Sequence, residues 1–277
     1  MQRRAFLLLV LIASTAPLIS QENFFARWEQ RTSGTQSRQP AWPPPLVTTY
    51  VGLIQVYRAD FTRQTASSGV QTWSLDGGKG LNLIPFANTE LDLDLPPYLE
   101  HSQPSVADGA GDLSFVLKYR FLAGNAHRGS YVVSAFLPAT LPTGSYKNGS
   151  ADATISPGVA LGKGFGPFVV QSTLGGLLPA LDTQKLGRSI AWNTAAQLRV
   201  AKTFWPEVEF NSTYYKGGSS DGRNQTFVTP GLLVAHKLRS DDETSRLGLC
   251  VGAGEQIATS HFHSYDHGLA FTTRLLF

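Results

Sequence analysis

The chain has 277 residues, with 23 Lys and Arg against 20 Asp and Glu, and 11% of its residues are aromatic. It has no cluster of basic residues interleaved with aromatics, which argues against a nucleic-acid partner. Cys250 is the sole cysteine, so no disulfide can form within the chain. An exported protein of this size must then be held by its own packing or by a membrane.

The first twenty residues have the order of an export signal. Arg3 and Arg4 precede a short apolar run from Ala5 to about Ile12, and small and polar residues follow through Ser20. This order predicts a cleaved signal peptide over residues 1–20, because a membrane-spanning helix needs roughly 20 apolar residues. Cleavage near Ser20 removes the two arginines and lowers the formal charge from +3 to +1. The alternative is an uncleaved N-terminal anchor helix.

Residues 21–49 combine Ser, Thr, Gln and Arg with the run Trp42-Pro43-Pro44-Pro45. Proline has no backbone N–H, and proline-rich polar sequence stays extended without joining a sheet. We therefore expect a disordered periplasmic tether, which either hangs free or plugs the domain that follows.

From Tyr50 onward, apolar and polar residues alternate with a period of two between turn residues, which indicates strands and not helices. In the last strand, His267–Phe277, Leu269 and Phe271 share one face with Leu275. The other clear strands are Thr89–Leu95, Asp112–Phe121, Ser189–Val200, Glu207–Tyr215 and Arg246–Ile257. Less regular strands are expected near Tyr50–Thr62, Val70–Pro85, Ser130–Ala139, Ala153–Gly162, Pro167–Leu178 and Gln225–Leu238.

These segments predict an all-β fold, a transmembrane antiparallel up-and-down β-barrel of about twelve strands over residues 50–277. An even strand number places both termini in the periplasm, and the two longest connections, Pro96–Ala110 and Thr140–Asp152, then fall on the outer side. A soluble β-sandwich also alternates, with its polar face outside. The membrane barrel is favoured by the terminal Phe277 on an apolar face, by aromatics such as Phe204 near strand ends, and by the lack of cysteine pairs.

Charged side chains recur on the strand faces opposite to the apolar ones. Because Arg or Lys on the lipid face costs about 2–4 kcal/mol at the bilayer centre, these charges are expected to line the lumen. There they form either a polar permeation path or a salt-bridged filling that stiffens a narrow barrel. The candidates are Glu90, Asp92, Asp94, Asp112, Lys118, Arg120, Arg199, Glu207, Glu209 and Arg274.

An expected outer loop and the strand after it carry His261, His263 and His267, next to Asp266. Neutral imidazole is a common metal ligand, so a metal site is one hypothesis and a plain polar loop is the other. A rim enzyme would need His261 or His263 within hydrogen-bond reach of a serine and a carboxylate, and no Gly-x-Ser-x-Gly motif is present. Cys250, between glycines on the expected lumen face, is interpreted as a packing residue.

Three segments carry a resemblance to a known family. Gly109–Phe121 (GAGDLSFVLKYRF) resembles the G-x-GD-x-x-x-x-x-KYR strand of the bacterial transporter family named for the MetA pathway of phenol degradation. Leu137–Tyr146 (LPATLPTGSY) is similar to its x-P-TG segment, and Ser156–Gly166 (SPGVALGKGFG) to its x-PG-x-x-x-x-K-x-x-G hairpin. The resemblance covers roughly Leu81 to Phe277.

This resemblance implies an outer-membrane barrel that is loosely similar to channels for hydrophobic compounds. It implies no catalytic residues and no cofactor. The residues that match the family pattern do so as structural positions only: Lys118, Tyr119, Arg120, Gly144 and Gly164.

We therefore expect a passive outer-membrane channel for small, and in particular apolar, molecules, and not an enzyme. Its partners would be membrane lipid, lipopolysaccharide, the solute, and the barrel-assembly machinery that reads the C-terminal strand ending at Phe277. The alternative is a non-conducting barrel with a filled lumen, which presents its outer loops for adhesion or binding.

Overall fold

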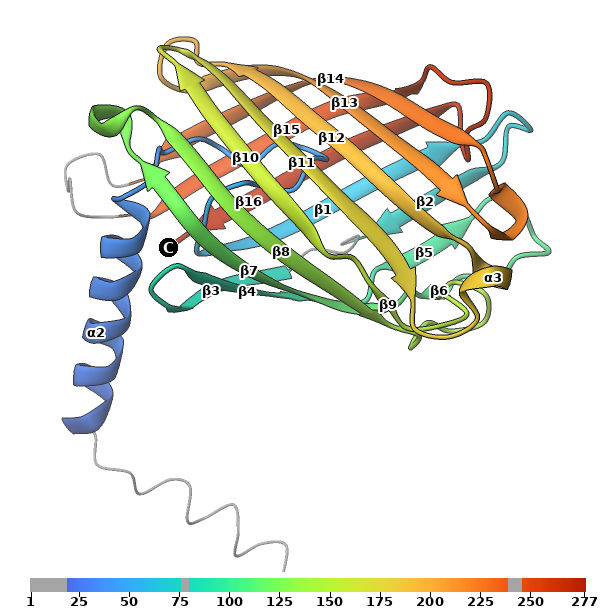
Figure 1. Ribbon diagram of the computed structural model, residues 1–277, viewed down its shortest axis with the longest axis horizontal. Helices are drawn as coiled ribbons and strands as arrows, with labels where there is room; N and C mark the ends of the chain where they lie inside the picture. The colour runs from blue at the N-terminus through green and yellow to red at the C-terminus, as the bar shows by residue number, and fades with distance from the viewer. Residues whose placement is uncertain (1–18, 76–79, 239–245) are drawn as a thin grey trace, which may run out of the picture.

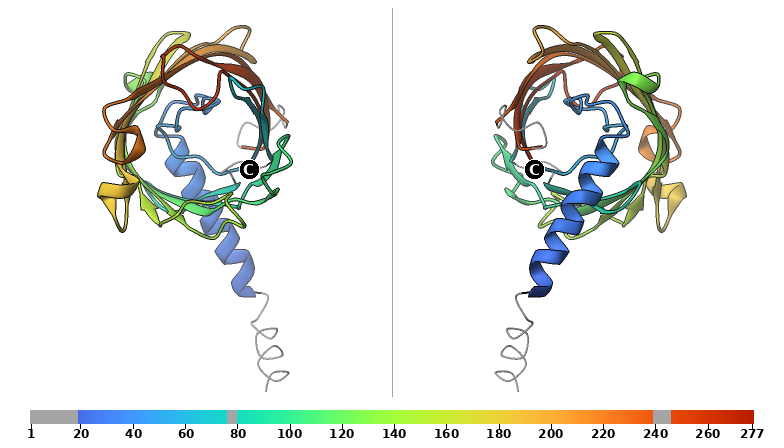
Figure 2. Two further views of the ribbon diagram at one scale, coloured as in Figure 1. Left: turned by 90° about the vertical axis from the view of Figure 1, so that its right-hand side faces the viewer. Right: turned by 90° about the vertical axis from the view of Figure 1, so that its left-hand side faces the viewer.

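The computed structural model describes residues 19–75, 80–238 and 246–277, and it places them in a closed β-barrel whose N-terminal chain lies inside (Figures 1 and 2). The predicted signal peptide up to residue 18 and the predicted turn 239–244 lie outside the described residues. In the part of the chain that is described, no helix is long and apolar enough to cross a membrane.

The strands are β1 (Val56–Thr65), β2 (Gln71–Leu75), β3 (Gly80–Phe86), β4 (Thr89–Asp94), β5 (Tyr98–His101), β6 (Gly109–Ala110), β7 (Leu113–Gly124), β8 (Tyr131–Leu141), β9 (Thr154–Ile155), β10 (Gly158–Phe165), β11 (Phe168–Pro179), β12 (Arg188–Leu198), β13 (Phe204–Lys216), β14 (Asn224–Lys237), β15 (Gly248–Ala258) and β16 (His267–Leu276). The helices are α2 (Ile19–Gln36) and the short α3 (Thr183–Leu186), with 3-10 turns at Ala126–Arg128 and Gly218–Ser220.

Neighbouring strands pair antiparallel, and β16 pairs with β1 from Val56–Leu276 to Thr65–His267, which closes the barrel. Four barrel strands are divided: β2 and β3 both pair with β1, β5 continues β4, and β6 and β9 continue β7 and β10. Counted with each divided strand once, the described residues form twelve strands, as the sequence predicts. Closure gives every strand two neighbours, so the backbone groups of the wall can pair without water.

Side chains alternate between the interior and the exterior along each strand. In β13, Glu207 and Glu209 are buried whereas Val208 is 53% exposed. Leu117 and Phe121 are among the many large apolar side chains on the exterior. A continuous exposed apolar surface of this extent is stable against lipid, not water, so the barrel spans a membrane. Not every aromatic near a strand end faces outward, because Trp205 is buried and faces inward with Glu207.

The two ends of the barrel differ in their connections. At one end, here the short-turn end, the strands are joined by tight turns such as residues 87–88 and 166–167. At the other, the long-loop end, the connections include residues 142–153 and 259–266. This alternation matches the expected pattern of turns and loops. The assignment of the short-turn end to the periplasm stays a prediction.

The N-terminal chain differs from the expected disordered tether. Residues 19–36 form α2, because this stretch has no proline and contains Gln, Glu, Arg and Ala, which are good helix formers. The helix ends before Pro40 and the Pro43–Pro45 run, which lack the N–H groups a helix requires. From there the chain enters the barrel, where Figure 2 shows it crossing the inside of the ring before it turns into β1.

Candidate functional site in the barrel interior

Residues 39–55, here the inner segment, fill the middle of the barrel. All but three of these residues are buried, and the exceptions are Ala41, Val47 and Thr49. Trp42, Leu46 and Val51 belong to the apolar core of the molecule together with wall residues of several strands. The inner segment is therefore the core of the barrel and not an appendage to it.

Glycines in the wall leave room for two apolar side chains of the inner segment, Leu46 and Trp42. A Cβ at Gly254 would lie 2.7 Å from Leu46 Cδ1, and one at Gly231 would overlap the same methyl group. A Cβ at Gly162 would lie 2.7 Å from the indole of Trp42. These positions lack side chains, so the wall forms two sockets, one for Leu46 and one for Trp42.

The packing of Leu46 against Gly231 can be tested by substitution. Gly231→Ala should overpack the Leu46 socket and weaken seating of the inner segment by about 1–3 kcal/mol. The thiol of a Thr48→Cys reporter, at a position that is 1% exposed, should then react with an aqueous reagent about ten-fold faster or more in a Cys250→Ala background. The effect of Gly231→Ala should shrink in a Leu46→Ala background, which vacates the socket. Equal effects in the two backgrounds would show that Leu46 does not fill it.

Carboxylates of one wall hold the main chain of the inner segment. Glu209 accepts hydrogen bonds from the backbone N–H groups of Val47 (2.8 Å) and Thr48 (2.6 Å), and Glu207 accepts one from Leu46 (3.0 Å). These donors have no sheet partner, and an unpaired buried N–H would be costly. The two glutamates of β13 thus complete the hydrogen bonding of a segment that joins no strand.

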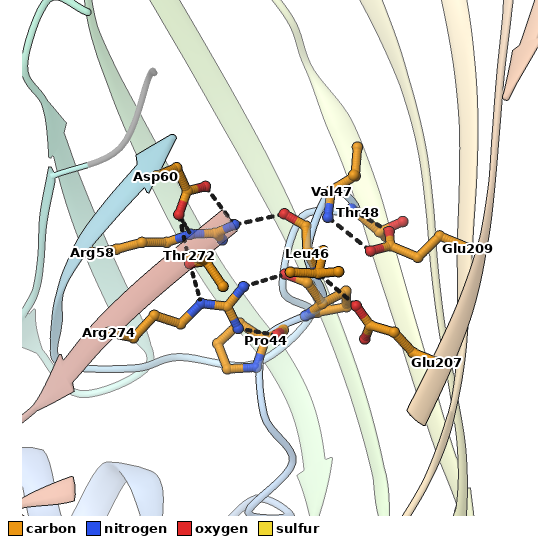
Figure 3. A network of polar contacts seen from close by, with 11 residues as sticks. Pro44, Leu46, Val47, Thr48, Arg58, Asp60, Glu207, Glu209, Thr272 and Arg274 are labelled. Atoms are coloured by element: carbon orange, nitrogen blue, oxygen red, sulfur yellow. Dashed lines mark hydrogen bonds and ion pairs between the residues drawn. The ribbon is translucent and has the colours of Figure 1, made fainter. Parts of the chain in front are cut away.

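Cations of the opposite wall hold the carbonyl groups of the same stretch (Figure 3). Arg274 of β16 donates to the carbonyls of Pro44 and Pro45, the latter at 2.7 Å, and Arg58 of β1 donates to that of Leu46 at 2.6 Å. A proline has a carbonyl acceptor but no backbone N–H that would need a partner, and a guanidinium group only donates hydrogen bonds. The two prolines can therefore be satisfied by arginine side chains alone.

Two further side chains fix these cations. Asp60 forms an ion pair with Arg58 at 2.7 Å, and Thr272 accepts from Arg274 Nε at 3.0 Å. Both arginines are nearly inaccessible to solvent. The inner segment is therefore clamped between Arg58 and Arg274 on one side and Glu207 and Glu209 on the other, as Figure 3 shows.

A second polar cluster holds the inner segment near the short-turn end. Lys118 forms an ion pair with Glu90 (2.6 Å) and donates to the carbonyl of Gly52 (3.3 Å), while Glu90 accepts from the N–H of Ile54. Arg120 donates to the carbonyl of Thr35 at 2.8 Å, at the end of α2. This cluster joins the wall to the C-terminal end of the inner segment and to the end of α2.

Most of the predicted lumen charges thus lie inside the barrel. Asp92 and Asp94 of β4 also face inward, and Asp94 accepts from the Ser114 hydroxyl at 3.2 Å. Sequence reasoning did not single out Arg58, Gln171 and Gln197. Both glutamines donate to the carbonyl of Pro43. The sequence signal that could have identified these residues is that each lies on the polar face of a strand in which polar and apolar residues alternate.

Two predicted lumen residues lie elsewhere. Arg199 is exposed in the turn after β12, because the β11–β12 hairpin ends at the Phe168–Leu198 pair. Asp112 lies between β6 and β7, where its carboxylate accepts hydrogen bonds from the N–H groups of Gly144 and Ser150. Burial alone would raise the pKa of Asp112, but these backbone hydrogen bonds outweigh it and lower that pKa. Asp112 therefore anchors the loop over residues 142–153.

The histidines of the long-loop end are not brought together. His263 contacts the Asp266 carboxylate (2.7 Å) and the Ser260 carbonyl (2.8 Å), whereas His267 contacts Glu255 (3.1 Å) and His261 is exposed. Among the described residues, no group of three His, Cys, Asp or Glu side chains is arranged to hold a metal ion.

The hydrogen bonds of His263 can be compared with the serine, histidine and carboxylate arrangement that an enzyme at the barrel rim would need. Both ring nitrogens of His263 are occupied, and Ser67 donates to Asp266 (2.6 Å) and not to the imidazole. The Ser260 carbonyl and then the Asp266 carboxylate raise the pKa of His263, as a structural hydrogen bond does. Cys250 is buried on the interior face, in line with its interpretation as a packing residue.

A cavity of about 510 Å³ opens near the long-loop end, beside the inner segment. Thr49 contributes to its lining from the inner segment, and the wall contributes the apolar groups of Phe136 and Leu177 and the polar groups of Asn193 and Tyr215. Of the described residues that line it, Arg188 is the one that carries a charge. A second space of about 160 Å³ lies between Leu46, Val47 and the wall of β1, β15 and β16.

Comparison with solved structures gives matches to membrane channels. An outer membrane channel from Pseudomonas putida F1 has 16% sequence identity and a TM-score of 0.56, with 86% of this chain and 100% of that chain covered. The NanC porin has 9% identity and a TM-score of 0.49, over 80% of this chain and 98% of the porin. At these identities, the channel from Pseudomonas putida F1 supports the barrel fold.

No curated protein matches the chain. A family model described as "Putative MetA-pathway of phenol degradation" matches residues 54–232, which is more than half of the 277 residues. The match begins within the inner segment and extends into β14. On this evidence, the chain belongs to the MetA-pathway phenol-degradation family of barrel proteins.

Proposed function

We propose that this protein is a gated passive channel of the outer membrane for small molecules, and that the inner segment is its gate. The observation that carries the proposal is the clamp on residues 44–48, where Arg58 and Arg274 face Glu207 and Glu209 across the lumen. All four of these side chains bind the main chain of the inner segment, and among the described residues none of the four forms an ion pair with another of the four. Withdrawal of the segment would open a path lined by charges of both signs.

The long-loop cavity supports the uptake of small, partly apolar solutes. Its lining combines apolar groups such as Phe136 with hydroxyl and amide groups, and no carboxylate is found among the described residues that line it. Few precisely placed polar groups on an apolar surface are typical of small-molecule sites. We propose solutes with an apolar body and a hydroxyl group, in keeping with the description of the family.

A non-conducting barrel is the second candidate. It is favoured by the packing of the inner segment and by the wall ion pairs Lys118–Glu90 and Arg58–Asp60. In that case the loops of the long-loop end would carry the function, through adhesion or binding.

Several features of the cellular setting belong to the proposal. A signal peptide cleaved near Ser20 would export the chain, and the short-turn end would face the periplasm. Lipopolysaccharide would surround the long-loop end, and the assembly machinery would recognise the strand that ends at Phe277. We propose no catalytic activity.

A disulfide between the inner segment and its socket tests the gate. Leu46→Cys with Gly231→Cys, in a Cys250→Ala background, places two thiols at the contact where a methyl group of Leu46 now meets Gly231, and a disulfide forms there if the two Cβ atoms come within about 3.5–4.5 Å. The refolded barrel should be silent in planar bilayers when oxidised and should conduct after reduction. Each single-cysteine chain is the control and should not respond to the oxidant.

Two outcomes would contradict the gate. Equal conductance before and after reduction, with the cross-link confirmed, would mean that solutes pass without movement of Leu46. Silence in every one of these chains, with heat-modifiable barrel folding confirmed, would favour the non-conducting barrel.

A further inference from the structure

Helix α2 leaves the barrel sideways. Figure 2 shows it passing from the interior across the rim and running outward from the barrel, and Figure 1 shows it beyond the ends of the strands. Its C-terminal half contacts the barrel at this end: Trp28 donates to the side chain of Gln55, the last residue of the inner segment, at 2.7 Å, and Arg31 donates to the carbonyl of Ile84 in the rim strand β3 at 3.4 Å. Thr32 also contacts Gln55, at 3.3 Å.

The helix face that contacts the rim continues outward as an aromatic face. Phe24 precedes Trp28 by four residues and Phe25 precedes Thr32 by seven, so helical periodicity places both on the side of these contacts. Phe24 is 52% and Phe25 is 66% exposed. Phe24 packs against both Phe25 and Trp28, at 5.5 and 5.9 Å between ring centroids. The opposite face carries Ala26, Gln30 and Ser33.

Lipid lies on the side of the rim to which this aromatic face points. The exterior of the barrel at the short-turn end carries exposed Phe86, Phe121 and Leu122, at 68%, 59% and 59%. Such residues mark the level at which the apolar belt of a barrel meets the head groups. A helix that rests on the rim and runs outward therefore passes over the surface of the adjoining leaflet.

We propose that α2 is a membrane-surface anchor whose Phe24 and Phe25 rings dock into the phospholipid leaflet at the short-turn end. The aromatic face would otherwise stay in water, and aromatic side chains favour the boundary between acyl chains and head groups. The face is continuous with the apolar exterior of the barrel, and this continuity favours lipid over a protein partner. The anchor joins the inner segment through two residues, so it would restrain the gate from the membrane side.

Site-directed spin labelling of the full chain tests the anchor. In a Cys250→Ala background, single labels are placed at Phe25→Cys and, as the matched control on the opposite face, at Gln30→Cys. The barrel is reconstituted in vesicles of phosphatidylethanolamine and phosphatidylglycerol. Collision with oxygen, which concentrates in lipid, is compared with collision with an aqueous nickel chelate. The ratio at Phe25 should shift from the aqueous value toward that of a lipid-facing label at Leu117→Cys, while Gln30 keeps the ratio of an aqueous loop.

A label at Phe24→Cys, which keeps the Phe25 ring, guards against loss of docking through the substitution itself. Water-like ratios at both phenylalanine positions would overturn the anchor. Shielding of both positions from oxygen and nickel alike would also overturn it, because that pattern indicates a protein partner or a second copy. The test does not depend on conduction, so a silent barrel leaves its outcome unchanged.

Discussion

A chain that begins at Val56 should conduct in large steady steps, whereas the chain that begins at residue 21 should be closed or open only in brief events. The first chain lacks α2 and the whole inner segment, and with them the side chains of Trp42, Leu46 and Val51 that fill the interior. A chain that begins at residue 50 should give smaller steps, because Tyr50, Val51, Leu53 and Ile54 are also buried there. Single-channel recording of the three refolded chains in planar bilayers measures the difference.

The opened pore should prefer cations. Among the described residues, the buried charged side chains of the interior are four cations and six carboxylates: Arg58, Lys118, Arg120 and Arg274, against Asp60, Glu90, Asp92, Asp94, Glu207 and Glu209. Water that enters the lumen would hydrate these groups and relieve the cost of losing the inner segment. The reversal potential across a salt gradient measures the preference.

Folding of the shortened chains is checked by heat-modifiable migration in gel electrophoresis. A folded chain from Val56 that stays silent would contradict the gate and support the non-conducting barrel. Equal step sizes for the chains from Val56 and from residue 50 would mean that residues 50–55 leave the path together with the rest of the segment.

The wall of the barrel could be predicted from the sequence because its signal is local. In β4, Glu90, Asp92 and Asp94 alternate with leucines, and this period of two determines both the strand and its faces. The same holds for β16, where Arg274 is buried between exposed neighbours. The errors at Asp112 and Arg199 are errors of strand ends, since each lies one residue beyond its strand.

The inner segment could not be predicted in this way, because its partners are distant in sequence. The hydrogen bond between Leu46 and Glu207 joins residues 161 positions apart in the sequence, and the hydrogen bond between Arg274 and Pro44 joins residues 230 positions apart. Trp42 and the three prolines resemble a solvated linker, since no local pattern reveals that a barrel will enclose them. A signal existed in the apolar residues that recur after Pro45, namely Leu46, Val47, Tyr50, Val51, Leu53 and Ile54, because a disordered segment is poor in such residues.

The second large effect is expected for Glu209→Ala. Glu209 accepts two backbone hydrogen bonds, from Val47 and Thr48, and hydrogen bonds to charged groups contribute about 1.5–3 kcal/mol each. Water that fills the space left by the side chain would recover part of this. A net weakening of the closed state by about 3 kcal/mol would raise the open population about 100-fold. Open probability in single-channel recordings of the full chain measures it.

Glu209→Gln is the matched control, because its amide keeps one acceptor oxygen and the shape of the side chain. It should fall between the native chain and Glu209→Ala. Asp94→Ala is a second control, since Asp94 is an interior carboxylate that accepts a hydrogen bond from Ser114 of the wall. An equal rise for Asp94→Ala and Glu209→Ala would mean that the loss of interior negative charge, and not the release of Val47 and Thr48, controls opening. A rise in open probability that is confined to the Glu209 variants would show that the hydrogen bonds from Val47 and Thr48 to Glu209 hold the gate closed.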